Sequence, residues 1–140
     1  MTAALILPDE FRARIEVDAR RNSPRECCGL IEGMREGDAV RVRALHATDN
    51  LAAAAGRFEI DPVEQFRLMR ALRGTGREIV GCYHSHPNGR AEPSARDLEH
   101  AAEEGFVWLI AALDTASNDV NLAAFAYENR AFAPLSLTLA

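Results

Sequence analysis

The chain has 140 residues, of which 48% are hydrophobic, and it carries a net charge of −5. This length fits one domain with its own core over residues 1–140, without disulfides or structural metals as staples. The acidic balance argues against nucleic-acid binding, which favours basic surfaces. The apolar stretch Ala3–Leu7 is too short for a signal or membrane segment, so we expect a cytoplasmic protein with no membrane partner.

The first half of the chain is expected to combine one helix with β-structure. The helix runs from Pro8 to Asn22, with Phe11, Ile15 and Ala19 as its apolar stripe. The elements expected after it are the strands Cys27–Ile31 and Ala39–Leu45 with a turn at Gly33–Gly37 between them, a loop at His46–Arg57 and a short strand at Phe58–Ile60.

The second half of the chain alternates between helix and strand. A helix begins at Asp61 as N-cap, with Pro62 and Glu64 completing the start signal, and ends at Gly74. The elements expected after it are the strand Glu78–His84, the polar loop Pro87–Pro93, a helix from Ser94 to near Gly105, and the strands Phe106–Leu113, Val120–Tyr127 and Leu135–Leu139. Intermixed helices and strands predict an α/β sandwich.

His84 and His86 stand two residues apart at the end of the predicted buried strand. Residues i and i+2 of a strand point to the same side, about 6.6 Å apart, so both rings can reach one metal ion while Ser85 faces away. Asp97, in the first turn of the next helix, adds a carboxylate. Two imidazoles and a carboxylate suit a catalytic zinc with a water in the fourth position, whose pKa zinc lowers towards ~7.

Each part of this pattern also has a simpler explanation. A lone His-x-His pair often has no function, and Ser94 with Asp97 is a good helix capping box in its own right. The combination of both at this spacing favours the metal site.

Hydrolysis at such a metal needs a base and a donor for the developing oxyanion. Ser94 is the natural donor because it is close in sequence to the ligands. Spacing alone leaves four glutamates open as the base: Glu26, Glu32, Glu59 and Glu92. Among these, Glu26 directly precedes an apolar strand, where partial burial would raise the pKa of its carboxyl group.

Three segments of the sequence together resemble the JAMM (MPN-plus) metalloproteases: Glu26–Gly33, His84–Pro87 and Pro93–Asp97. The family pattern is Glu, a long gap, His-Ser/Thr-His, seven residues, Ser, two residues, Asp, and Pro87–Pro93 supplies the seven. The likeness is strongest to the small stand-alone bacterial type that includes the sulfur-carrier-protein cysteine peptidases.

The resemblance implies a cytidine-deaminase-like fold, with a curved mixed β-sheet flanked by helices. It also implies one zinc per chain with a bound water, held by His84, His86 and Asp97. Glu26 would then be the base that activates the water, and Ser94 would steady the tetrahedral intermediate.

The activity implied is hydrolysis after the C-terminal glycine of a ubiquitin-like protein, whose extended tail is clamped beside the zinc, partly at a sheet edge. The type it resembles most releases cysteine from a sulfur-carrier protein, as in cysteine biosynthesis. The alternatives are processing or deconjugation of another ubiquitin-like protein or peptide, or a catalytically silent MPN scaffold. Silent modules typically lose a ligand or the glutamate, and this chain keeps all of them. Its oligomeric state is not readable from the pattern.

Competing zinc and His-x-His folds lack support. Cytidine deaminases use His-x-Glu and Pro-Cys-x-x-Cys, and neither motif occurs here. A cupin would carry a glycine where Glu78 stands, and the amidohydrolase barrels need about 250 residues.

The three cysteines fit no disulfide framework, so Cys27, Cys28 and Cys82 are expected to be reduced thiols of unassigned role. Further residues without an assigned role in the chemistry are His46, Asn50, His100 and Trp108.

Overall fold

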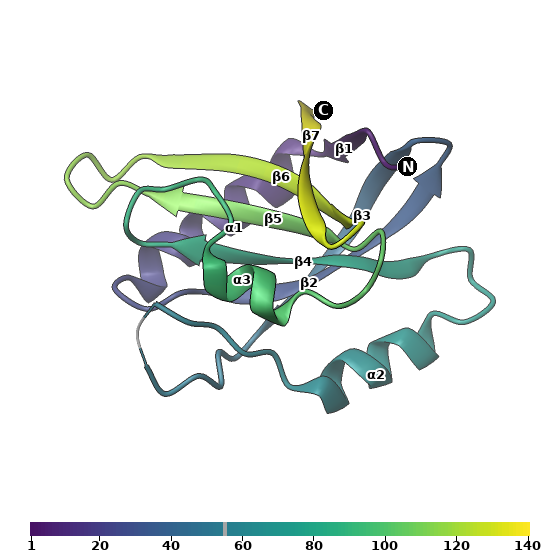
Figure 1. Cartoon of the computed structure of the whole chain (residues 1–140), viewed down its shortest axis with the longest axis horizontal. Coiled ribbons are helices and arrows are strands. Elements are labelled where there is room, and N and C mark those ends of the chain that lie inside the picture. Colours follow the sequence, from purple (N-terminus) through teal and green to yellow (C-terminus); the bar gives the residue numbers. More distant parts are fainter. Residues whose placement is uncertain (55) are drawn as a thin grey trace.

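The computed structural model describes residues 1–54 and 56–140. Within these residues the chain forms seven strands and three helices (Figure 1). In order they are β1 (Ala4–Leu7), α1 (Asp9–Asn22), β2 (Cys28–Glu36), β3 (Ala39–Thr48), α2 (Pro62–Ala71), β4 (Glu78–His86), α3 (Ala95–His100), β5 (Val107–Leu113), β6 (Val120–Glu128) and β7 (Ala131–Leu139).

The seven strands form one mixed sheet that closes into a barrel in the order β1-β3-β2-β4-β5-β6-β7. The parallel pairs are β1 with β3, β1 with β7, and β4 with β5, and the other neighbours are antiparallel. This arrangement confirms the α/β class and the mixed sheet with helices. The closure was not foreseen, because the segment Ala3–Leu7 was not predicted to be a strand.

Several predictions for the first half differ from the structure. β3 continues to Thr48 instead of ending at Leu45, because residues 46–48 still pair with β2, so the predicted loop begins only after Thr48. β2 continues to Glu36, because Gly33–Glu36 still pair with β3, and the turn is confined to Gly37 and Asp38. The predicted strand Phe58–Ile60 is wrong, since this segment is an irregular connection whose side chains pack on the core.

Several boundaries in the second half also differ. α2 ends at Ala71 rather than Gly74, and β4 continues to His86 rather than ending at His84. α3 ends at His100 rather than near Gly105, because Ala101 already has an extended backbone with ψ of 130°. β7 begins at Ala131 instead of Leu135, since Asn129 and Arg130 both take a positive φ and form a tight hairpin turn directly after β6. Tight turns of this kind favour residues such as asparagine.

The core consists of two clusters on opposite faces of the central strands. The first core cluster includes Ile15 and Ala19 of α1, so α1 covers one face, behind the strands in Figure 1. The second core cluster contains Leu30, Ile79, Cys82, Phe106 and Trp108, and partly buried residues from α2 and β7 pack against it. β4 lies between the two clusters, and the candidate site is at its C-terminal end.

A β-bulge in β4 sets which face the motif residues point to. Gly81 pairs with Ile31 while Ile79 pairs with Glu32, so Val80 has no partner of its own in the β2 ladder. The extra residue shifts the alternation: Val80 packs in the first core cluster, whereas Cys82 packs in the second. From Cys82 onward, the even-numbered residues of β4 therefore face the side on which α3 lies.

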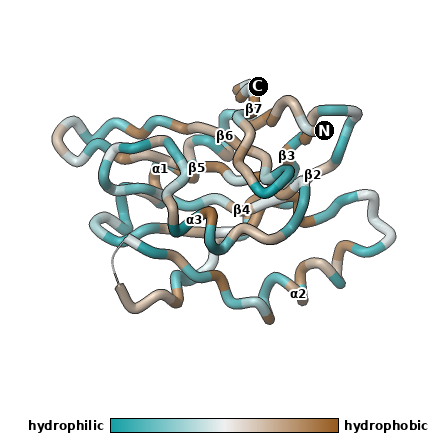
Figure 2. The backbone as a smooth tube through the Cα atoms, viewed as in Figure 1, coloured by the Kyte–Doolittle hydropathy of each residue, from teal (hydrophilic) through white to brown (hydrophobic). Residues whose placement is uncertain are grey.

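α2 differs from the other helices because none of its residues is buried. It nevertheless carries several hydrophobic residues, visible as brown segments in Figure 2. Leu68 and Leu72 lie near the second core cluster, while Val63, Phe66 and Met69 are exposed. Among the described residues, no helix has the length and apolar character needed to span a membrane.

Candidate metal centre

The central strand β4 positions both motif histidines. It is hydrogen-bonded to β2 on one side and β5 on the other, and His84 and His86 lie opposite Ile110 and Ala112 of β5. The strand extends past His84 to His86, so both side chains emerge on one side as predicted. They are deeply buried, with 0% and 6% of their surfaces exposed. Pairing with both neighbours at His84 and with β5 at His86 thus fixes their separation and direction.

The N-terminus of α3 positions the carboxylate. Ser94 is the N-cap, its Oγ accepts the backbone N–H of Asp97 at 3.0 Å, and Asp97 Oδ2 accepts the backbone N–H of Ser94 at 2.8 Å. The capping box expected from the sequence is therefore present. The same Asp97 carboxylate is only 4% exposed and also faces both histidines. Asp97 can therefore cap α3 and face both histidines in one and the same conformation.

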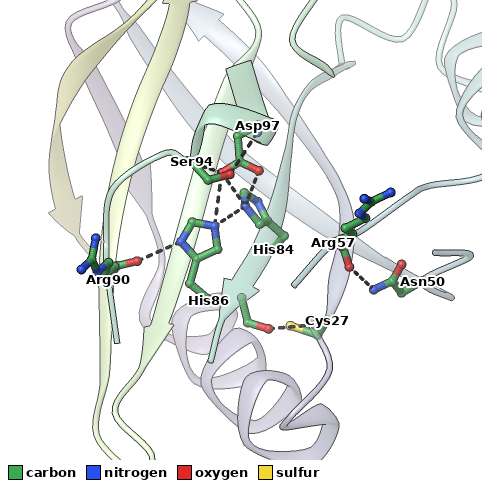
Figure 3. A network of polar contacts seen from close by, with 9 residues as sticks. Cys27, Asn50, Arg57, His84, His86, Arg90, Ser94 and Asp97 are labelled. Atoms are coloured by element: carbon green, nitrogen blue, oxygen red, sulfur yellow. Dashed lines mark hydrogen bonds and ion pairs between the residues drawn. The ribbon is translucent and has the colours of Figure 1, made fainter. Parts of the chain in front are cut away.

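Three donor atoms converge on one point (Figure 3). The Nε2 atoms of His84 and His86 are 2.9 Å apart, and each is 3.2 Å from the carboxylate of Asp97. Adjacent ligand atoms of a tetrahedral zinc with bonds of ~2.0–2.1 Å are about 3.3 Å apart. Two imidazole nitrogens and a carboxylate oxygen at this spacing fit a zinc ion in donor type and in separation.

The two histidine rings are oriented by different means. His86 donates its Nδ1 proton to the carbonyl oxygen of Arg90 at 2.9 Å, which leaves the Nε2 lone pair facing the convergence point. His84 is stacked on Phe58 with 4.2 Å between ring centroids, and Trp108 meets it edge-on at 5.8 Å. The Nδ1 of His84 is buried and has no hydrogen-bond partner among the described residues. Aromatic packing, which the sequence did not reveal, thus holds this ring.

The electrostatics favour an ionised carboxylate beside neutral imidazole at His84. Burial alone would raise the pKa of Asp97, but hydrogen bonds to His84 and His86 outweigh it and hold that pKa well below its usual range. Burial lowers the pKa of His84. A carboxylate anion and a neutral imidazole are the forms that bind zinc.

Glu26 lies beside the histidines, directly before β2. Its carboxylate and the ring nitrogens of His84 and His86 all lie within 4.8 Å of one another, so Glu26 approaches the same two histidines that face Asp97. Glu26 is 6% exposed, and its burial raises the pKa of the carboxyl group to about 7, with His86 opposing the shift. A carboxyl group with this pKa is matched to proton transfer near neutral pH.

The other candidate bases lie elsewhere. Glu32 is also buried, but it pairs with His46 at 2.9 Å and with Arg77 at 3.0 Å. Burial opposes its ionisation, yet these two partners outweigh burial and lower its pKa. Glu59 lines a separate cavity of about 370 Å³ near α2. These two glutamates therefore do not meet the histidines.

A cleft of about 640 Å³ gives access to the site. Glu26, His86 and Ser94 line it, together with Arg90 and Glu92. Glu92 thus shares the cleft without joining the group of converging donor atoms. A peptide placed in this cleft would meet the carboxylate of Glu26, the ring of His86 and the hydroxyl group of Ser94 together, whereas His84 lies buried behind them.

Two polar residues near the site were given no role from the sequence. Ser85, which points away from the histidines as predicted, accepts the backbone N–H of Cys27 at 2.8 Å. Asn50 donates to the carbonyl oxygen of Glu26 at 2.9 Å. Because Ser85 stands between the two histidines on the strand, the sequence shows that it faces the opposite side, where it contacts Cys27. No local pattern in the sequence marks the contact between Asn50 and Glu26.

The three cysteines are free and buried. Burial raises the pKa of the Cys27 thiol to about 12 and raises that of Cys28, so neither forms a reactive thiolate near neutral pH. Cys82 packs in the second core cluster beside Trp108, as expected for structural residues.

Comparison with known proteins supports the same family. The sequence profile of prokaryotic homologues of the JAB domain matches residues 8–126. A desampylase of Haloferax volcanii is 36% identical over 107 residues, which is 76% of this chain and 76% of that protein. A CysO-cysteine peptidase of Mycobacterium tuberculosis is 34% identical over 85 residues, or 61% of this chain and 57% of that protein.

A solved structure extends the likeness to the whole fold. The solution structure of a protein from Desulfitobacterium hafniense matches with a TM-score of 0.84 at 28% identity, covering 97% of this chain and 92% of that one. The family profile covers most of the chain, and the relatives above are small JAMM-type proteins. The chain belongs to the prokaryotic JAB-domain family, the JAMM-type proteins that its motif resembles.

Proposed function

We propose that this chain is a zinc-dependent peptidase that hydrolyses the bond after the C-terminal glycine of a ubiquitin-like protein. The observation that carries the proposal is the convergence of His84, His86 and Asp97 within 3.2 Å of one another, beside the buried Glu26. A catalytically silent scaffold has no need to keep three ligand atoms and a carboxyl group of raised pKa at the end of one cleft.

His84, His86 and Asp97 would hold the zinc. A zinc ion bound there would polarise the scissile carbonyl group and lower the pKa of water at the site. Glu26 takes the proton from the attacking water and passes it to the leaving amine nitrogen, which its pKa of about 7 allows in both directions. The proton balance then closes without another residue.

Ser94 is placed to stabilise the oxyanion. Its Oγ accepts the N–H of Asp97 at 3.0 Å, which orients the hydroxyl oxygen and leaves the hydroxyl proton free to donate. The same residue lines the cleft with Glu26 and His86. A donor that is fixed before the substrate arrives needs no reorganisation when negative charge develops on the carbonyl oxygen.

The names of the relatives and the edge of the sheet support this substrate class. One relative is named for a CysO-cysteine adduct and another is named a desampylase. β1 pairs with β3 only over Ala39–Arg41, so residues 42–48 of β3 have a ladder partner on one side among the described strands. This edge ends at Thr48, which pairs with Cys28, the neighbour of His84. An extended C-terminal tail can add to such an edge.

A pair of matched substrates tests the proposal. The zinc-loaded protein is incubated with a sulfur-carrier protein bearing a C-terminal cysteine adduct, and with the same carrier linked to a lysine side chain. Mass spectrometry reads the release. Release of cysteine supports the carrier-cysteine assignment, and cleavage of only the lysine conjugate assigns deconjugation, which the longer match to the desampylase favours. Binding of both carriers without cleavage of either would identify a scaffold.

A further inference from the structure

The segment that carries Glu26 has no strand partner at that residue. Hydrogen bonds from neighbouring segments hold it in place. The backbone N–H of Arg25 donates to the carbonyl oxygen of Asn22 at 2.7 Å, and the carbonyl oxygen of Glu26 accepts from Asn50 at 2.9 Å. The N–H of Cys27 donates to Ser85 Oγ at 2.8 Å, and the carbonyl oxygen of Cys27 accepts the backbone N–H of Ser85 at 3.0 Å. β2 begins only at Cys28. The place of the Glu26 carboxylate therefore depends on these bonds rather than on a ladder.

Asn50 uses both ends of its side-chain amide. Its Nδ2 donates to the carbonyl oxygens of Glu26 and Arg57, each at 2.9 Å. Its Oδ1 accepts the backbone N–H groups of Ala52 at 2.9 Å and Glu59 at 3.0 Å. An amide has two donor protons and two acceptor lone pairs, so all four are satisfied. Figure 3 shows the Asn50 amide facing the backbone of Arg57.

These four bonds join two parts of the site that are far apart in sequence. Through Glu59, the Oδ1 atom fixes the backbone next to Phe58, whose ring stacks on His84. Through Nδ2, the same side chain fixes the backbone of Glu26. Arg25 reinforces the connection, because its guanidinium donates to the carbonyl oxygen of Ala52.

We propose that Asn50 is a positioning residue that sets the distance between the base Glu26 and the histidine pair by bonding the backbone on both sides. The inference rests on the proposed function, in which Glu26 transfers the proton. Asn50 itself does not touch the reacting atoms in this assignment. Small displacements of a catalytic group, on the order of 1 Å, reduce rates by about a hundredfold, so a backbone anchor of this kind acts on kcat.

Asn50→Asp is the sharpest test because it keeps the shape and both acceptor contacts. It replaces the two N–H donors with an oxygen that faces two carbonyl oxygens, which pushes the Glu26 backbone away. We expect kcat to fall by about ten- to a hundredfold, with KM within about twofold and zinc content unchanged. An unaltered kcat in the folded variant would overturn the inference.

Thr75→Ala is the matched control for a loop anchor. Thr75 Oγ1 donates to the carbonyl oxygen of Leu72 at 2.6 Å and accepts the N–H of Arg77 at 3.1 Å, in the turn after α2. Its loss should lower the midpoint of thermal unfolding without changing kcat. If Thr75→Ala and Asn50→Asp reduce kcat equally, Asn50 has only a general structural role and the inference is wrong.

A double-mutant cycle locates the effect. In a Glu26→Asp background the carboxylate is already displaced, so Asn50→Asp should reduce kcat further by less than about threefold. Full multiplicative effects would show that Asn50 acts independently of Glu26, against the inference. If Asn50→Asp does not fold, Asn50→Ala, which removes the donors without adding charge, takes its place in every comparison.

The proposed function and this inference can fail separately. Full activity of Glu26→Gln would show that Glu26 is not the base, so the base assignment and this inference would fail together while the peptidase activity stood. An inactive Glu26→Gln beside an Asn50→Asp of unaltered kcat would leave the proposed function intact and overturn the inference alone.

Discussion

The ligand side and the base side of the site are built in different ways. His84 and His86 project from a strand that pairs with β5 at both residues and with β2 at His84, and Asp97 projects from the capped first turn of a helix. Glu26 lies just outside a strand and is placed by side-chain bonds from a distant loop. Secondary structure therefore sets the ligand geometry, whereas tertiary contacts set the position of the base.

The largest effect is expected on the ligand side. The double variant His84→Ala, His86→Ala should lose the metal and reduce turnover by about a thousandfold or more, since two of three ligands are gone. Metal analysis and a turnover assay check this. His100→Ala is the matched control, because His100 is exposed and outside the converging group. Zinc retained at full occupancy in the double variant would contradict the ligand assignment.

A change on the base side should reduce turnover while the protein keeps its metal. Glu26→Gln preserves size but cannot accept a proton, so kcat should fall by about a hundred- to ten-thousandfold. Zinc content measured on the same preparation should equal that of the parent. A variant that lost zinc together with activity would instead place Glu26 among the ligands, as its distance from the histidines allows.

The aromatic support of His84 should act on metal affinity. Phe58→Leu keeps an apolar side chain but removes the stacked ring, so the zinc dissociation constant should rise by about tenfold, the lower end of the range for residues that orient a ligand. Competition with a chelator measures it. Phe125→Leu is the control, because its ring packs against the second core cluster and contacts Phe132 rather than His84. Equal affinity losses in the two variants would show a general packing effect.

The smallest effect on turnover is expected at the second buried glutamate. Glu32→Gln weakens the pairs with His46 and Arg77 and should cost about 1–2 kcal/mol of unfolding free energy with kcat unchanged. The pKa of Glu32 is lowered in the fold, so its stabilisation is present above its ordinary pKa and is lost as pH falls through the lowered value. Denaturant unfolding of parent and variant should therefore differ at neutral pH and converge in acid. A constant difference at all pH values would rule out the charge as its source.

The difference between residues positioned by secondary structure and residues positioned by tertiary contacts also explains what could be predicted from the sequence. The spacing of His84 and His86 and the capping signature of Ser94 and Asp97 are local patterns, so the three proposed ligands and the start of α3 could be predicted from them. Phe58 was assigned to a strand, because nothing local shows that its ring stacks on His84. Contacts between segments depend on how the whole chain closes, and the sequence carries no local trace of them.

The closure of the barrel could not be predicted for the same reason. Ala4–Leu7 are apolar and could be core or strand, and only their parallel pairing with both β3 and β7 makes them the strand that closes the barrel. The bulge at Val80, which sets the face on which the histidines emerge, is likewise invisible in a run of apolar residues.

The double duty of Asp97 bears on how such a domain can lose its activity. A change of Asp97 to alanine removes a proposed ligand together with the contact of its carboxylate to the backbone N–H of Ser94, which is one half of the capping box of α3. A change of Glu26 to glutamine removes the base and leaves every backbone hydrogen bond of its segment in place. Relatives that turn into inactive binding modules should therefore pass more readily through loss of the glutamate, and the aspartate should persist longer as a fold residue.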